Sequence, residues 1–348
     1  MNKFMNLSFE NNSVLPLYMQ IANAVVNNIQ KGNLNIHEKM PSINTFSKKY
    51  SVSRDTVEKA YKVLKQRKIL VAKKGKGTFV NSSRIIVKTK VLFLINKPSQ
   101  YKLEVYNAFT KDLGEDYLVN FEVYHCDEVL FFNLLEQNLH TYDYFVIMPH
   151  FNTSSDERQN FSETVLKLIK SISSDRLIIL DNNDLKLGNQ CIEIFQDFER
   201  DTFEGLNNAY FKIKKYQELI LVTPKRFNYS YIDKITNACK KFCNYHEFGF
   251  KVLNEVSHNT IVGKENLFIV LEDDDLVKLL DKLNQLKLEL GRDVGVIAFN
   301  ETPFKRLLGI SVMSTNFKLM GETAASMMLN RQKSKVKNKF CFIDRISC

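Results

Sequence analysis

The chain has 348 residues, of which 44% are hydrophobic, and a formal net charge of +10. This length allows about two or three domains with a substantial buried core. No apolar run reaches the roughly 18–20 residues of a membrane-spanning helix, and the first residues lack the apolar stretch of a secretory signal, so we expect a cytoplasmic protein with no membrane partner.

The positive charge lies in the first 80 residues. They contain 14 Lys and Arg against 4 Asp and Glu, whereas the rest of the chain contains 35 of each kind. A basic segment attached to a neutral remainder indicates that only this segment meets a polyanion. A solvated surface that is basic by chance is the alternative explanation.

Cysteine and histidine are spread thinly. The six cysteines form no Cys-x-x-Cys pair or Cys/His cluster, and the six histidines lie mostly singly. This pattern is typical of buried thiols in a reducing compartment and argues against zinc. The sequence therefore predicts no metal site.

Three helices are predicted near the N-terminus. Apolar residues recur every fourth position between Leu17 and Ile29, which indicates an amphipathic helix. A second helix over 42–50, with Phe46 facing inward, and a third over 54–67 each follow a serine that can cap the first turn.

The second and third of these helices form a predicted helix-turn-helix. In this arrangement the last helix lies in the major groove of DNA, and its first residues touch the bases. Arg54 and Thr56 occupy that position. The guanidinium of an arginine suits guanine because it can bind O6 and N7 together.

A small basic hairpin, or wing, is predicted after the third helix. Short apolar stretches over 69–72 and 78–80 enclose the turn Lys-Lys-Gly-Lys-Gly at 73–77. Gly75 and Gly77 permit close backbone approach or a positive φ, and the three lysines can meet phosphates or a minor groove. Taken alone, these lysines would be an ordinary solvated turn.

Four motifs in this region carry a family resemblance. Pro-Leu-Tyr-Met-Gln-Ile-Ala at 16–22, Met-Pro-Ser at 40–42, Val-Ser-Arg-Asp-Thr-Val at 52–57 and Gly-Lys-Gly-Thr at 75–78 resemble the winged-helix domain of the GntR family of bacterial transcription regulators. The resemblance implies DNA binding. Asn44 stands where many members carry Arg, which implies a weaker or different backbone contact there. The full set of expected DNA contacts is Ser42, Asn44, Ser53, Arg54, Thr56, Lys59, Lys74, Gly75, Lys76 and Gly77.

From residue 91 onward, short apolar runs alternate with helical patterns. Unbroken apolar runs are typical of strands that are buried on both faces. Repeated strand–helix alternation predicts a doubly wound α/β domain with mainly parallel sheets. The runs lie at 91–95, 144–148, 177–180, 219–222, 267–271 and 294–299.

Polar residues follow these runs directly. Open α/β sheets bind ligands beyond the carboxyl ends of their strands, and groups with several donors and acceptors fit a polyhydroxylated ligand such as a sugar. Capping of the following helices is the simpler role for any single residue. The strand ends make Asn96, His150, Asp181, Lys225 and Glu272 candidate ligand contacts.

The C-terminal part carries a second resemblance. The stretch from Gly291 to Pro303, the stretch from Gly309 to Ala325 and the segment Ile194-Phe-Gln-Asp197 resemble the periplasmic-binding-protein-like effector domain of LacI-type repressors. The resemblance implies two lobes joined by crossing strands, with a ligand between them. It adds Asp197 and Asn300, at positions where that family often holds sugar hydroxyls. Tyr101 is a further candidate, for stacking on a sugar ring, with core packing as its alternative role.

The predicted organisation is therefore an N-terminal winged helix-turn-helix domain over 1–80, a linker over 81–90, and a two-lobed periplasmic-binding-protein-like α/β domain over 91–348. Crossovers between the lobes are expected near 196–198 and 299–315. We expect residues 300–315 to complete the first lobe.

These features predict a homodimeric transcription regulator of the repressor type. Its expected partners are a palindromic operator in double-stranded DNA and a small effector, a monosaccharide or sugar phosphate, for which fucose and arabinose are the first to test. A DNA-binding domain fused to an enzyme-like α/β domain is the alternative. The sequence lacks a nucleophile elbow, a dinucleotide-binding fingerprint and a His-Glu-x-x-His motif, so we expect no catalytic residue and no cofactor.

Overall fold

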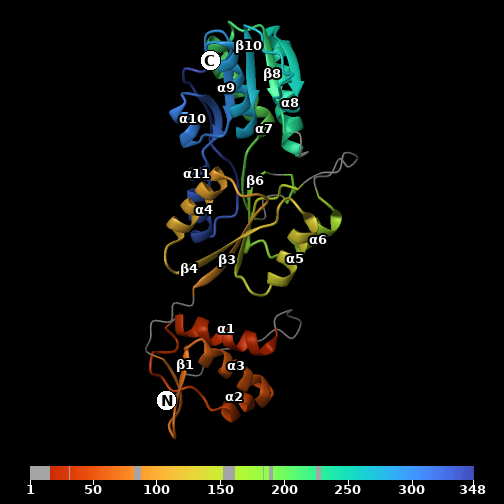
Figure 1. The fold of residues 1–348 in the computed structure, drawn as a ribbon. Coiled ribbons are helices and arrows are strands. Elements are labelled where there is room, and N and C mark those ends of the chain that lie inside the picture. Colours follow the sequence, from red (N-terminus) through yellow and green to blue (C-terminus); the bar gives the residue numbers. More distant parts are fainter. Residues whose placement is uncertain are drawn as a thin grey trace. The chain divides into compact units, whose positions relative to one another are not determined.

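The computed structural model describes residues 16–30, 32–81, 88–151, 161–182, 184–187, 191–224 and 229–348 (Figure 1). The chain divides into two compact units, Met1–Lys88 and Thr89–Cys348. We call the first unit the head and the second the body.

The head is a winged helix-turn-helix, as the sequence predicts. It contains α1 (Leu17–Gln30), α2 (Ile43–Tyr50), α3 (Arg54–Gln66) and a hairpin of β1 (Leu70–Lys73) and β2 (Gly77–Val80). The apolar faces of the three helices meet in one core, which confirms that the predicted period of four marks the buried side of α1.

Two serines fix where α2 and α3 begin. Ser42 Oγ accepts a hydrogen bond from the amide of Thr45, and Ser53 Oγ accepts one from the amide of Thr56, each at 3.1 Å. These bonds satisfy amides that have no partner within the helix. Between the helices, Ser51 adopts a left-handed conformation with φ 54° and turns the chain.

The body holds two six-stranded sheets (Figure 1). The first is built from β3 (Thr89–Ile95), β4 (Tyr117–Val123), β5 (Tyr144–Ile147), β6 (Leu177–Asp181), β7 (Ile192–Phe195) and β13 (Lys335–Lys337). The second is built from β8 (Glu218–Val222), β9 (Gly249–Leu253), β10 (Asn266–Val270), β11 (Gly295–Phe299), β12 (Ser311–Thr315) and β14 (Phe340–Ile343).

Both sheets are mainly parallel. The first has the order β13-β7-β6-β5-β3-β4, and every neighbouring pair in it is parallel. The second has the order β14-β12-β11-β10-β8-β9, in which only β14 runs antiparallel to its neighbour. This confirms the predicted doubly wound body.

Helices cover both faces of each sheet. The first sheet packs between α4 (Gln100–Leu113) with α11 (Phe317–Leu329) on one face, and α5 (Glu128–Asn138) with α6 (Glu163–Ser171) on the other. The second packs between α7 (Phe198–Ile213) with α8 (Ser230–His246) on one face and α9 (Asp273–Leu286) on the other, and α10 (Pro303–Leu307) joins β11 to β12. We call these two assemblies the first and second lobe.

The strand β3 shows why the apolar runs are unbroken. Val91, Phe93 and Ile95 pack into the cluster with α4 and α11, whereas Leu92 and Leu94 pack into the cluster with α5 and α6. Successive side chains of a strand point to opposite faces, so a strand covered on both sides needs apolar residues at every position.

The chain crosses between the lobes after β7, after β12 and after β13. The expected placement of residues 300–315 in the first lobe is wrong. The short connection through α10 brings β12 beside β11 in the second sheet, with Ile297 opposite Ser311, so the chain crosses only after Thr315.

Asn338 joins the three crossing segments. Its side-chain amide donates to Thr315 Oγ1 at 2.8 Å and to the carbonyl of Asn316 at 2.9 Å, and its backbone amide donates to the carbonyl of Phe195 at 2.8 Å. Buried polar groups that are hydrogen-bonded in this way hold the segments in one register.

All six cysteines are free, and all except Cys341 are buried. This agrees with the expected role of packed thiols. Among the described residues, no helix combines the length and the apolar character that a bilayer crossing requires.

Candidate functional site

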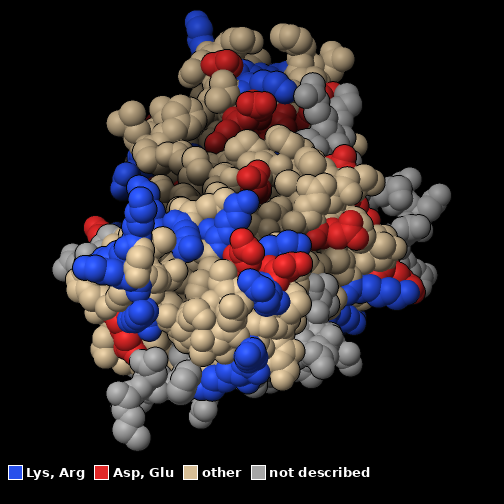
Figure 2. All heavy atoms as spheres, turned by 90° about the horizontal axis from the view of Figure 1, so that it is seen from below, with Lys and Arg blue, Asp and Glu red and all other residues tan. Residues whose placement is uncertain are grey.

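The first candidate surface is the exposed side of α3 in the head. Arg54 is the first residue of the helix, Lys59 lies about one turn further on, and both are exposed. Neither forms an ion pair with another described residue. Thr56 is half-buried, with its Oγ1 2.7 Å from Ser53 Oγ. In Figure 2 the Lys and Arg side chains stand out at several places on the face seen from below. The helix therefore presents cations that form no ion pair with the described carboxylates.

The wing adds a second group of exposed cations. The turn is closed by the amide of Lys76, which donates to the carbonyl of Lys73 at 2.9 Å. Gly75 and Gly77 have φ of 71° and 108°, so their expected positive φ is confirmed. A Cβ on Gly77 would also lie 3.0 Å from Cε of Lys39. Lys74 and Lys76 are exposed. Of the other expected contacts, Ser42, Asn44 and Ser53 are exposed at the starts of α2 and α3.

The second candidate site is a cavity of about 290 Å³ between the lobes of the body. It opens at the carboxyl ends of strands from both sheets, which is where doubly wound proteins hold ligands. Residues expected from the sequence that line it are Asn96, Tyr101, His150, Asp181, Glu272 and Asn300. Lys225 lies outside the described residues.

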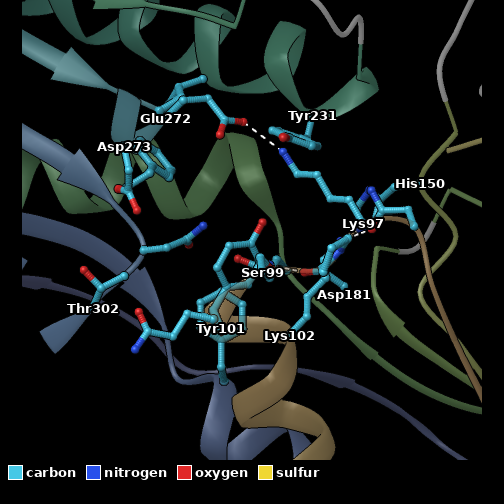
Figure 3. Close-up of a pocket in the computed structure, with 18 of the residues that line it drawn as sticks. Lys97, Ser99, Tyr101, Lys102, His150, Asp181, Tyr231, Glu272, Asp273 and Thr302 are labelled. Carbon is cyan, nitrogen blue, oxygen red and sulfur yellow. Dashed lines mark hydrogen bonds and ion pairs between the residues drawn. The ribbon is translucent and has the colours of Figure 1, made fainter. Parts of the chain in front are cut away.

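Asp181 is the centre of a buried polar network on the first-lobe wall (Figure 3). Its Oδ2 lies 2.7 Å from His150 Nε2, and its Oδ1 accepts a hydrogen bond from Gln196. The side-chain amide of Asn182 donates to the carbonyl of Pro149 at 2.6 Å and lies 3.2 Å from His150 Nδ1. The ring of His150 therefore lies between the Asp181 carboxylate at Nε2 and the Asn182 side chain at Nδ1.

This network keeps Asp181 ionised inside the protein. Burial opposes the charged form, but the charge and hydrogen bond of His150, with Lys102 and Gln196, hold the pKa of Asp181 below its ordinary value. Asp181 also has φ 80°, a left-handed conformation that is uncommon outside glycine. Strained backbone of this kind is found at functional sites, where the surrounding contacts impose it.

The second-lobe wall is built around the start of α9. The acidic run at 272–275 forms its N-cap and first turn, where negative charge is favourable. Asp273 pairs with the buried Lys305 at 2.7 Å. Lys305 also donates to the carbonyls of Phe299 at 2.6 Å and Asn300 at 2.9 Å, which ties α10 to the end of β11.

Aromatic rings flank the polar walls. Tyr231 stacks on Phe198 with 5.0 Å between ring centroids and on Tyr229 with 5.2 Å. On the other side Tyr101 packs against Phe317 at 4.7 Å. Tyr101 therefore has the packing role considered for it, on the start of α11, and because it also lines the cavity its stacking on a sugar ring stays a prediction.

Polar contacts join the two lobes beside the cavity. Lys97 of the first lobe reaches Glu272 of the second at 3.0 Å, as Figure 3 shows. Asp184 accepts from Ser230 at 2.7 Å and from Lys234 at 2.6 Å. These contacts hold the lobes close together around the cavity.

Asp197 does not line the cavity, contrary to expectation. Its Oδ1 accepts from the amide of Arg200 at 3.2 Å, and its own amide donates to Asp201 at 3.0 Å. It thus caps α7 after the crossover. The preceding residue, Gln196, lines the cavity instead.

Sequence reasoning also missed Lys102, Gln196, Tyr231 and Lys305. All four line the cavity, but none directly follows one of the apolar runs. Lys102 and Lys305 lie in the first turns of α4 and α10, the helices that follow β3 and β11. A lysine in the first turn of a helix, where the helix dipole disfavours positive charge, is the signal that could have identified them.

The cavity offers groups that can bind a polar ligand. Carboxylates and amide oxygens accept hydrogen bonds, ammonium groups donate them, and aromatic rings supply flat apolar surface. Among the described residues there is no cluster of His, Cys, Asp and Glu that could hold a metal ion. The arrangement can hold a small molecule with several hydroxyl groups.

Comparison with known proteins separates the chain into the same parts. Residues 17–80 match the family of bacterial regulatory proteins called the gntR family, and residues 209–340 match the periplasmic binding protein-like domain. The uncharacterized HTH-type transcriptional regulator YurK of Bacillus subtilis is 36% identical over 91 residues, which are 26% of this chain and 36% of YurK. The chain spans only about a third of the length of the curated relatives it matches.

Solved structures resemble the body. A periplasmic binding protein/LacI transcriptional regulator from Alkaliphilus metalliredigens, complexed with D-xylulofuranose, has a TM-score of 0.56 at 9% identity, covering 75% of this chain and 99% of that one. A LacI family transcriptional regulator from Lactobacillus casei with bound glucose has a TM-score of 0.56 at 12% identity, covering 74% and 99%. These likenesses show the fold.

Proposed function

Because the chain joins a gntR-family regulatory domain to a periplasmic-binding-protein-like domain, we propose that it is a transcription regulator and not an enzyme. Its head binds duplex DNA, and its body binds a small sugar that changes the DNA affinity. The observation that carries this proposal is the convergence of strand-end polar residues from both lobes on one cavity, in a chain with a basic winged-helix head.

The head supports DNA binding through two kinds of contact. Arg54 and Thr56, at the start of α3, are placed to reach base edges in the major groove. Lys74 and Lys76 of the wing are placed for phosphates, which fix orientation without reading sequence. Ser42, Asn44 and Ser53 lie at helix starts, where backbone amides favour phosphate binding.

The body supports a sugar as the effector. Asp181, Asn300 and Glu272 offer acceptors, and Tyr231 offers a flat ring. Ligand pockets are commonly about 300–1,000 Å³, so a cavity of about 290 Å³ suits one sugar ring better than two. Two proteins with this fold are described with bound D-xylulofuranose and glucose. Sugars with one ring, including fucose and arabinose and their phosphates, are therefore the first to test.

The mechanism we propose is linkage between the two sites. Two heads of a homodimer read the halves of a palindromic operator about 34 Å apart. The sugar binds more tightly to one arrangement of the lobes, and the operator binds more tightly to one spacing of the heads. A coupling of about 1–3 kcal/mol would then change operator affinity roughly 5- to 150-fold.

Two measurements on the full chain test this function. Selection from random duplex DNA should yield one enriched, palindromic motif, and thermal shift against a panel of monosaccharides and sugar phosphates should identify the effector. Failure to enrich any motif would contradict the role of the head. Absence of a thermal shift with every sugar and sugar phosphate would contradict the role of the body.

A further inference from the structure

Two buried lysines line the cavity, and they differ in how fully they are bonded. Lys305 is 3% exposed and donates to two carbonyls and to Asp273, so its three N–H groups are all used. Lys102 is 2% exposed and donates only to Oδ1 of Asn96. An ammonium has three donors and no acceptor. Lys305 therefore holds the fold together, whereas Lys102 keeps donors available toward the cavity.

Lys102 also lacks a bonded counter-charge. The other cavity lysines, Lys97 and Lys305, are paired with Glu272 and Asp273. No described carboxylate forms an ion pair with Lys102. Burial lowers the pKa of Lys102 to about 8, although nearby Asp181 acts in the opposite direction. Its ammonium is therefore buried with one hydrogen bond and no ion-paired carboxylate, an arrangement that disfavours the positive charge.

Other donors lie at the same corner of the cavity. Ser99 precedes α4 and lies three positions before Lys102, on the same side of the first turn. Its Oγ is buried and does not cap the helix, and it interacts with the Tyr101 side chain. The first turn of α4 therefore presents its positive end, a hydroxyl and an ammonium together. A hydrogen-bond acceptor with negative charge would stabilise all of these groups.

We propose that the effector is a monosaccharide bearing one carboxylate, and that Lys102 and the Ser99 hydroxyl bind that carboxylate. This inference rests on the proposed role of the cavity as the effector site. The sugar hydroxyls then face Asp181 and the second-lobe wall, which supply acceptors.

The charge of Lys102 argues against two related classes of ligand, neutral sugars and sugar phosphates. A neutral sugar brings no negative charge to Lys102, so the ammonium would keep only its bond to Asn96 and the unbonded charge of Asp181. A phosphate carries about −1.5 to −2 charge at pH 7, more than one ammonium neutralises, and Asp181 and Glu272 line the same cavity. A carboxylate brings one negative charge, and its two oxygens can accept from both donors.

Calorimetric titration of the full chain tests the inference. The probes are D-glucuronate, D-galacturonate and D-gluconate, against D-glucose and D-galactose as neutral counterparts and glucose 6-phosphate as the dianion. We expect one of the sugar acids to bind at least 10-fold more tightly than its neutral counterpart and than the phosphate. Equal or tighter binding of the neutral sugar or of the phosphate overturns the inference and leaves the proposed function intact. No binding of any sugar counts against the proposed function itself.

Proton uptake gives a readout that needs no variant. Near pH 8 about half of Lys102 is neutral in the free protein, so a bound carboxylate should draw up to about half a proton from the buffer. Titrations at pH 8 in two buffers of different ionisation enthalpy measure this uptake. A sugar acid that binds without proton uptake overturns the contact with Lys102.

A pair of variants separates charge from packing. Lys102→Met should weaken sugar-acid binding about 10- to 100-fold, as expected for loss of a charge-assisted hydrogen bond, while Lys102→Arg keeps the charge and part of the affinity. The melting temperature of free Lys102→Met should equal or exceed that of the wild type, because an unpaired buried charge is removed. Unchanged sugar-acid affinity in Lys102→Met would refute the assignment.

Discussion

Replacement of Asp181 by Asn perturbs the buried network without straining the backbone. Asn tolerates the left-handed φ of 80° that this position requires, and it matches Asp in size. The amide has only one acceptor oxygen, whereas the carboxylate accepts from both His150 and Gln196. In Asp181→Asn, one of these donors must therefore face an NH₂ group.

The number of hydrogen bonds lost in Asp181→Asn sets the expected decrease in the free energy of unfolding. Loss of one hydrogen bond to a charged group costs about 1.5–3 kcal/mol, and the donor left without an acceptor adds about 1–3 kcal/mol. Removal of the buried charge of Asp181 offsets part of this loss of stability. We expect the free energy of unfolding of the body to fall by about 2–4 kcal/mol. At roughly 2–4 °C per kcal/mol for a domain of 150–250 residues, its melting temperature should fall by about 4–16 °C.

The effect should depend on pH in one direction. The folded-state pKa of Asp181 is lowered from 3.8, so its charged form contributes stability that is present above pH 3.8 and is lost as the pH falls through the folded-state value. The difference between wild type and Asp181→Asn should therefore be constant near neutral pH and should shrink below about pH 3.8.

Scanning calorimetry of the full chain, at several pH values, measures both effects. Asp197→Asn is the matched control, because Asn can still cap α7, and it should change the free energy of unfolding by less than about 0.5 kcal/mol. A loss below 1 kcal/mol in Asp181→Asn, or a difference that grows on acidification, would refute the account of this network.

The remaining predictions concern the head and the packing of the first lobe. Arg54→Ala should cost about 1–3 kcal/mol on operator DNA and little on random duplex, as measured by fluorescence anisotropy; equal losses on both would show that Arg54 does not read a base. The double variant Lys74→Ala, Lys76→Ala should weaken operator and random DNA alike and reduce the log–log salt slope by about 1 for each lysine, and an unchanged slope would contradict phosphate contact. Gly321→Ala should destabilise the body by roughly 1–3 kcal/mol or more, since its Cβ would lie 2.3 Å from a carbonyl of α4. Gly249→Ala, whose Cβ would lie 3.3 Å from its nearest neighbour, a side-chain carbon, is the control, and equal melting temperatures of the two variants would contradict the close α4–α11 contact.

The sequence predicts the elements of the head and body because their signals are local. Ser42 and Ser53 act as caps through bonds to amides three residues away, and these bonds need nothing from the rest of the fold. The runs at β3, β6 and β11 are apolar at each position because helices cover both faces of their sheets.

The lobe boundaries and half of the cavity depend on contacts that no local pattern contains. β12 belongs to the second lobe because its backbone pairs with β11. The sequence of residues 300–315 does not by itself specify this partner, so these residues could not be assigned to a lobe from it. Lys102 and Lys305 have the composition of surface residues. Lys305 is buried by its bonds to Asp273 and to the end of β11, and Lys102 is buried beside Asn96, and these contacts form only in the folded lobes.

The most direct test of the account is the affinity of the full chain for its selected operator with and without a saturating effector, at fixed salt concentration. We predict a change in dissociation constant of about 5- to 150-fold, and a reciprocal change of the same factor in effector affinity when operator DNA is present. An operator affinity that stays constant while the effector occupies the cavity would contradict the claim that the body controls the head.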